Sequence, residues 1–151
     1  MPSKFIKIII FCFVSVLFFM CKKKEEPAPD PIPTLELISI SPSTVNEFTD
    51  SVLIKLRYTD KNGDLGDLSP DDRSLYVKDS RLPNADMYHV KPLAPVSGKN
   101  IPIEGELTVK LNSLFVLGAG TVELTTLVIK MKDRAGNWTE ELTSPQITIK
   151  K

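Results

Sequence analysis

Alternation of side chains in residues 52–59 is the feature that most limits how this chain can fold. In the run VLIKLRYT, the apolar residues Val52, Ile54, Leu56 and Tyr58 occupy every second position. Successive side chains of a β-strand point to opposite faces of the sheet, so a period of two is typical of a strand with one buried face. The pattern therefore predicts a β-strand with one buried face over residues 52–59.

Similar segments follow along the chain, separated by turn residues. We expect further strands at residues 35–40, 74–78, 87–91, 107–111, 121–132 and 138–150. A change of phase near Thr125 and Thr126 indicates a bulge, and Pro145 is expected to divide the last segment and confine it to a sheet edge. About seven strands without a convincing amphipathic helix predict an all-β fold, a single antiparallel β-sandwich over residues 35–150.

The first 34 residues have a different composition from the rest of the chain. Lys4 and Lys7 precede a run from Ile8 to Met20 that is apolar except for Ser15. A membrane-spanning helix needs about 20 apolar residues, so this shorter run suits a secretory signal peptide. Prolines at every second position from 27 to 33 then favour an extended polyproline II segment. We expect a signal peptide at 1–20, a proline-rich stalk at 21–34 and the folded domain at 35–150.

Charge and cysteine content narrow the possible partners. Removing Lys4 and Lys7 with the signal leaves 17 basic against 19 acidic residues, a net charge of −2. Without a basic excess, nucleic acid is not an expected partner. Cys12 also leaves with the signal, so Cys21 is the one cysteine that remains. We therefore expect the domain to fold without a disulfide.

The apolar run ends at Cys21, and charged residues follow at once. This arrangement resembles a bacterial lipoprotein signal. The resemblance implies that the chain is cut just before Cys21 and that acyl chains such as palmitate are attached there, which would tie the protein to a membrane. Two or more acyl chains make such an anchor stable. The alternatives are an ordinary signal peptide or an uncleaved anchor, in which Cys21 has no special role.

The residues directly after Cys21 are three lysines and two glutamates. This basic-then-acidic cluster resembles the surface-export signal of Bacteroidetes-type lipoproteins. The resemblance implies a lipid-anchored protein of the outer membrane that faces the cell surface. The alternative is a charged spacer, with the protein on the periplasmic face.

Two motifs of the domain, YTDKNGDLGD and KDRAGNWT, resemble loops of bacterial immunoglobulin-like and cadherin-like modules. The resemblance implies an immunoglobulin-like sandwich.

Closely spaced oxygen ligands on a glycine-bent loop also suit a hard cation such as calcium. If the strands at 52–59 and 121–132 leave the same end of the sandwich, the two motifs lie side by side. The residues predicted to hold a structural calcium ion are Asp60, Asn62, Asp64, Asp67, Asp133 and Asn137. The alternative is that these are turn residues whose side chains bond nearby backbone without a metal.

Three aromatic residues are candidates for a surface on which a sugar stacks. They are Trp138, Tyr76 and Tyr88. The alternative for Trp138 is a plug at the edge of the core, because large aromatic side chains are usually mostly buried.

No sequence pattern of a known catalytic site occurs, so we do not expect an enzyme. We expect a non-catalytic cell-envelope lipoprotein that presents an immunoglobulin-like module for adhesion, structural or assembly interactions. The alternative is an accessory surface lipoprotein that binds glycan or peptide for an uptake system. Neither expectation names the protein or glycan partner.

Overall fold

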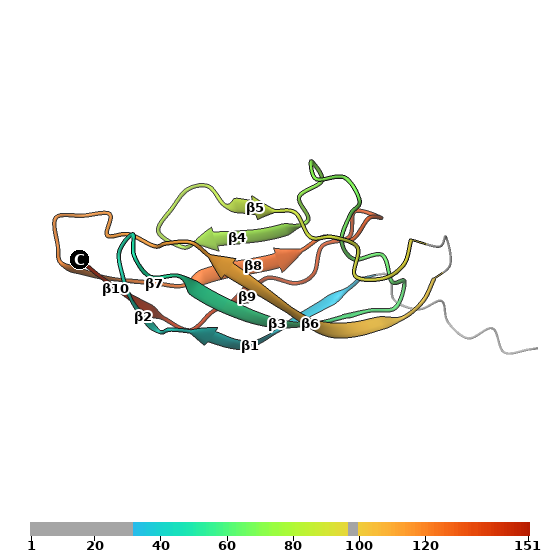
Figure 1. Ribbon diagram of the computed structural model, residues 1–151, viewed down its shortest axis with the longest axis horizontal. Helices are drawn as coiled ribbons and strands as arrows, with labels where there is room; N and C mark the ends of the chain where they lie inside the picture. The colour runs from blue at the N-terminus through green and yellow to red at the C-terminus, as the bar shows by residue number, and fades with distance from the viewer. Residues whose placement is uncertain (1–31, 97–99) are drawn as a thin grey trace, which may run out of the picture.

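The computed structural model describes residues 32–96 and 100–151, and all regular structure in these residues is β (Figure 1). The predicted all-β class is thereby confirmed. The predicted signal peptide, Cys21 and most of the predicted stalk lie outside the described residues. The ten strands are β1 (Thr34–Ser41), β2 (Thr44–Asn46), β3 (Val52–Asp60), β4 (Leu75–Asp79), β5 (Asp86–Tyr88), β6 (Ile103–Leu111), β7 (Val122–Thr125), β8 (Leu127–Met131), β9 (Leu142–Thr143) and β10 (Ile147–Lys150).

The strands form three small sheets with the orders β1-β3-β6, β2-β10-β7 and β5-β4-β8-β9. All neighbours are antiparallel except β2 and β10, which run parallel. Strands β7 and β8 are separated by Thr126 alone, yet they belong to different sheets. The irregularity predicted at Thr125 and Thr126 is therefore the point where the chain passes from one sheet to another.

One hydrophobic core lies between the sheets. The alternating residues Val52, Ile54 and Leu56 of β3 are fully buried, as their spacing predicts. They share the core with Ile129 of β8 and Ile149 of β10, which come from the other two sheets. Each such side chain contributes about 1.5–3 kcal/mol when it leaves water. The shared core makes the three sheets one domain.

The last predicted segment differs from expectation. Pro145 does divide it, because β9 ends at Thr143 and β10 begins at Ile147. The prediction that the whole segment lies at a sheet edge is wrong, since β10 lies between β2 and β7. The proline sits in the connection between the two strands, so its missing N–H removes no ladder hydrogen bond from β10. The short strand β2 was not predicted.

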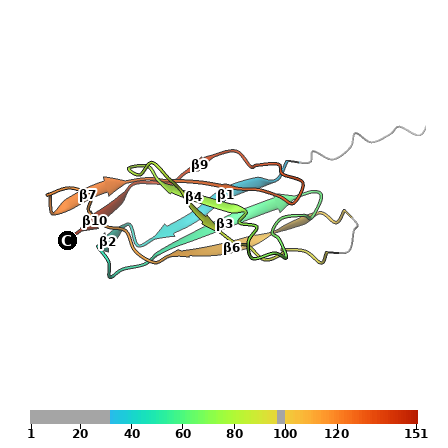
Figure 2. The same cartoon turned by 90° about the horizontal axis from the view of Figure 1, so that it is seen from above.

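The domain is elongated, and its two ends differ (Figures 1 and 2). Thr34 at the start of β1 pairs with Thr59 at the end of β3, so the described chain begins where β3 ends. We call this the entry end; the turn after β8 lies there too. The opposite end, which we call the far end, carries the turn after β2, the loop after β6 and the C-terminus. Within residues 32–96 and 100–151, no helix has the length and apolar character needed to cross a membrane.

Candidate functional site

The residues predicted to bind calcium lie at the entry end, on two loops. Residues 61–67 follow β3, and residues 133–137 follow β8. Leu65 forms an isolated antiparallel bridge with Asp133, and the Arg134 backbone N–H donates to the Asp64 carbonyl oxygen at 3.1 Å. The prediction that the two motifs lie side by side is therefore confirmed.

Asp60 organises the first of these loops. Asp60 is only 1% exposed to solvent. Oδ1 accepts the backbone N–H of Asn62 at 2.9 Å, and Oδ2 accepts the N–H groups of Asp64 at 2.7 Å and Leu65 at 3.1 Å. Three backbone donors are thereby satisfied by one carboxylate, which fixes the course of the loop after β3.

Asp133 closes the second loop in a similar way. It is also 1% exposed. Oδ1 accepts the backbone N–H of Asn137 at 2.7 Å, and Oδ2 accepts the side-chain amide of Asn137 at 2.9 Å. Asp67 accepts the N–H of Ser69 at 3.0 Å. These contacts are those of turn residues that bond nearby backbone.

Asp64 is less well satisfied than its neighbours. Its Oδ1 is buried and has no hydrogen-bond partner among the described residues. Burial raises the pKa of this carboxyl, and the charges of Asp133 and Asp60 raise it further, against the opposing effect of Arg134. The loop pair therefore holds one carboxylate whose negative charge is unfavourable where it stands.

Arg134 brings a positive charge to the same place. Its guanidinium donates to the carbonyl oxygen of Gly66 at 2.8 Å and to that of Gly63 at 3.3 Å. Both acceptors belong to the first loop, whereas Arg134 belongs to the second. The side chain thus joins the two loops directly.

The fit of a calcium ion follows from these contacts. Asp60 and Asp133 already direct both carboxylate oxygens at N–H donors, and a guanidinium already contacts two carbonyl groups of the first loop. In residues 32–96 and 100–151, no group of three or more acidic, histidine or cysteine side chains is placed to hold a metal ion. This arrangement does not match the open set of oxygen ligands that calcium needs, and it agrees with the alternative expectation of turn residues that bond nearby backbone. No observation on the described residues tests calcium binding itself.

A polar cavity of about 210 Å³ opens beside the same loops. Its wall carries charges of both signs, and it includes the buried Ser74, whose Oγ has no hydrogen-bond partner within the described part of the chain. The residues that line it are Gly66, Asp67, Asp72, Ser74, Lys132, Asp133, Arg134 and Gly136.

The structure brings together two of the three candidate stacking residues. Tyr76 and Trp138 meet edge to face, with ring centroids 6.4 Å apart and planes at 84°. The Lys130 ammonium lies 4.9 Å from the Tyr76 ring and 5.4 Å from the Trp138 ring. Tyr88 pairs with Leu75 across the two strands, whereas Tyr76 pairs with Met87. The Tyr88 side chain therefore projects from the face of β4 and β5 that is opposite to the face of Tyr76. The three residues do not form one plane.

Trp138 is nevertheless partly accessible. It is 37% exposed and borders a cavity of about 350 Å³. The other residues that line this cavity are Ile32, Pro33, Thr34, Leu35, Thr139 and Glu140.

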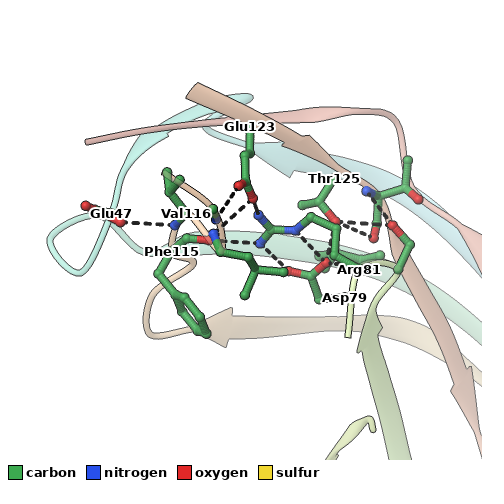
Figure 3. A network of polar contacts seen from close by, with 12 residues as sticks. Glu47, Asp79, Arg81, Phe115, Val116, Glu123 and Thr125 are labelled. Atoms are coloured by element: carbon green, nitrogen blue, oxygen red, sulfur yellow. Dashed lines mark hydrogen bonds and ion pairs between the residues drawn. The ribbon is translucent and has the colours of Figure 1, made fainter. Parts of the chain in front are cut away.

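A second polar network, which the sequence did not reveal, lies at the far end (Figure 3). The guanidinium of Arg81 contacts both carboxylate oxygens of Asp79, at 3.0 Å and 2.6 Å, and pairs with Glu123. It also donates to the Phe115 carbonyl oxygen at 3.0 Å. The Thr125 hydroxyl donates to Asp79. Arg81 therefore ties the turn after β4 to β7 and to the loop after β6.

Carboxylates hold the loop after β6 from two sides. Glu123 accepts the backbone N–H groups of Leu117 at 3.0 Å and Gly118 at 2.7 Å. Glu47, in the turn after β2, accepts the N–H of Val116 at 3.0 Å. The loop is thus fixed by side chains from β7 and from the turn after β2 (Figure 3).

Two phenylalanines stand on these fixed segments. Phe48 stacks on Phe115 with ring centroids 5.7 Å apart and planes at 6°. Phe48 is 71% exposed and has a positive φ of 59°. Its N–H donates to the Leu114 carbonyl oxygen at 3.2 Å. The available sequence signal was an aromatic residue inside the polar turn NEFTD.

Comparisons of the chain with protein-family models, with curated proteins and with solved structures found no match.

Proposed function

We propose that the protein is a non-catalytic lipoprotein of the cell envelope, held at the outer membrane through Cys21, whose β-sandwich makes adhesive or assembly contacts through its far end. The single observation that carries the contact role is the exposed, stacked Phe48–Phe115 pair on two fixed loops. The described chain begins at the opposite end of the domain (Figure 2). An anchor that precedes residue 32 would thus leave the phenylalanine pair free to meet a partner.

The energetic cost of the Phe48 backbone conformation and of its exposed ring supports a role for this pair beyond folding. A left-handed backbone conformation costs about 1–2 kcal/mol for a residue other than glycine. A large apolar ring that stays exposed to water contributes little hydrophobic stabilisation to the fold. Such strain persists where the surrounding structure enforces it, and it gathers at functional sites. Aromatic residues are also enriched among those that carry the binding energy of protein interfaces. Phe48 combines the strained backbone with an exposed ring, and Phe115 provides the second ring of the stacked pair.

A photo-reactive amino acid placed at position 48 of the full-length protein in living cells tests the contact role. Leu68 provides a matched control, because it is also apolar and 71% exposed but follows the acidic loop of the entry end. We expect a discrete cross-linked product from position 48 and none from position 68. Equal products from both positions, or none from position 48, would remove the basis for a docking role of the far end.

The anchor is tested separately. Cys21→Ser should abolish labelling by a fatty-acid analogue and release the protein from the membrane fraction. Protease treatment of intact cells should then degrade the wild-type domain if it faces outward, whereas a periplasmic domain should survive. Continued labelling of the variant would contradict a lipid on Cys21.

A glycan- or peptide-binding role is the second candidate, and the cavity beside Trp138 favours it. An exposed indole ring beside a cavity offers a stacking surface for a sugar or a proline-containing peptide. In that case Trp138→Ala should abolish retention on immobilised polysaccharide or peptide, and Phe48→Ala should not. The opposite result, in which only Phe48→Ala weakens adhesion at the cell surface, favours the far end.

A further inference from the structure

Three aspartates lie near one another where two loops meet at the entry end. Asp60 is the last residue of β3, Asp64 belongs to the loop after β3, and Asp133 belongs to the loop after β8. Asp60 and Asp133 are both buried, and each repels the negative charge of the Asp64 carboxylate. Like charges in a partly dry environment repel one another, so loops held in this way need a positive charge nearby.

Arg134 supplies a positive charge with a defined geometry. Its planar guanidinium extends from the second loop and donates to the carbonyl oxygens of Gly63 and Gly66 in the first. Carbonyl oxygens of a glycine-bent loop are also the groups that a calcium ion would use. The guanidinium therefore occupies hydrogen-bond acceptors for which a metal would compete.

The loop is shaped to keep those carbonyl groups in place. Gly63 and Gly66 have φ values of 68° and 79°, in the region that favours glycine. A Cβ at Gly63 would collide with the Ile101 carbonyl oxygen, and one at Gly66 with the Lys91 carbonyl oxygen. Both glycines are thus packed against backbone, and their own carbonyl groups have a fixed direction.

Other cations near the loops are used elsewhere or face water. The Lys132 ammonium lies 5.7 Å from the centre of the Trp138 ring. Lys61 and Arg73 are exposed. In contrast to Lys132, Lys61 and Arg73, the Arg134 side chain extends from the second loop and donates hydrogen bonds to the first.

We propose that Arg134 is a built-in cation that joins the two acidic loops, in the place where their spacing of aspartates predicts a calcium ion. A guanidinium stays protonated at any physiological pH and donates from a rigid fork. The loop junction therefore holds together without depending on the calcium concentration around the cell. This inference does not rest on the proposed far-end contacts.

Melting curves of the full-length protein in detergent, recorded in calcium and in a chelator, test this inference. We expect superimposable curves for the wild type. Arg134→Gln should lower the melting temperature by about 5–10 °C and should make the remaining stability rise with calcium, because the aspartates then lack their counter-charge. Arg73→Gln is the control, because Arg73 is exposed and stands between Asp72 and Ser74, which line the cavity beside the same loops. This variant should melt like the wild type in both conditions.

Arg134→Lys provides a second reading if Arg134→Gln does not fold. A lysine keeps the charge but cannot donate to two carbonyl groups from one plane, so we expect a smaller drop and no calcium response. Calcium that raises the melting temperature of the wild type would overturn the inference. An Arg134→Gln variant that melts like the wild type, or an Arg134→Lys variant that becomes calcium-dependent, would overturn it as well.

Discussion

Each end of the domain has an arginine that joins separate segments, but the two arginines bind different groups. At the far end, Arg81 contacts the carboxylates of Asp79 and Glu123 (Figure 3). At the entry end, Arg134 contacts the carbonyl groups of Gly63 and Gly66. The same kind of side chain therefore closes an ion-pair network at one end and a backbone junction at the other.

The difference shows in the carboxylates. Burial pushes the pKa of Asp79 upward, but hydrogen bonds from Arg81 and Thr125 outweigh it, and the pKa lies below its ordinary value. At the entry end, burial and two neighbouring aspartates hold the pKa of Asp64 above its ordinary value. The negative charge of Asp79 is thus stabilising, whereas that of Asp64 is unfavourable. We therefore expect removal of the two charges to have opposite effects on stability, with opposite pH dependence.

The largest effect is expected for Arg81→Ala. The substitution leaves Asp79, whose side chain is only 7% exposed, as a buried charge without its partner. Breaking a buried pair from one side typically costs about 3–5 kcal/mol. We expect a loss of that size in the free energy of unfolding, measured by urea titration. The loss should be larger than for Arg134→Gln, because Arg134 donates hydrogen bonds to carbonyl groups and acts on Asp64 through its charge without a direct ion pair.

Arg57→Ala is the control for this prediction. Arg57 and Glu36 also form an ion pair, but their side chains are 54% and 69% exposed and the atoms are 3.7 Å apart. Exposed pairs contribute about 1 kcal/mol at most. Equal losses in the two variants would show that the far-end network is no stronger than a surface contact.

Alternation and turn chemistry in the sequence predicted much of the fold. The period of two in β3 predicted its buried face, and the order of the strands predicted that the loops after β3 and β8 meet. Both inferences rest on local geometry that a single chain displays. The far-end network escaped prediction because no recognisable motif links Asp79 and Arg81, which lie in one turn, to Glu123, which is 42 residues from Arg81.

The role of the acidic loop was harder to predict for a different reason. Asp60 and Asp133 have oxygen atoms that suit either a cation or the N–H groups of a tight turn, and sequence spacing is compatible with both. The structure shows which backbone donors they accept. Only the position of Arg134 relative to Gly63 and Gly66, which depends on packing between the loops, suggests a counter-charge within the chain.

A smaller effect is expected for Asp79→Asn. Because the folded pKa of Asp79 is below its ordinary value of 3.8, its contribution to stability is complete above that value and is lost as the pH falls through the folded pKa. Hydrogen bonds to a charged group contribute about 1.5–3 kcal/mol, and the variant should lose an amount of that order at pH 7. The gap between variant and wild type should close in acid. Urea titrations across this range test it, and a gap independent of pH would contradict the assignment.

The smallest effect, and the one with the opposite sign, is expected for Asp64→Asn. The folded pKa of Asp64 is above its ordinary value of 3.8, so its contribution to stability is present below that value and is lost as the pH rises through the folded pKa. An amide removes the repulsion from Asp60 and Asp133 and can donate to Asp60. The variant should therefore be more stable than the wild type at pH 7, by less than about 1 kcal/mol, and should lose this advantage in acid.

Asp67→Asn serves as the control for Asp64→Asn, because its Oδ1 accepts the Ser69 N–H and the amide oxygen of asparagine can do the same. We expect a change within about 0.5 kcal/mol at either pH. A loss of stability in Asp64→Asn at pH 7 would mean that the Asp64 carboxylate binds a positive partner strongly. If that loss appeared only in calcium, the partner would be the metal. If it also appeared in chelator, the partner would be Arg134, and the two ends of the domain would then share one kind of ion pair.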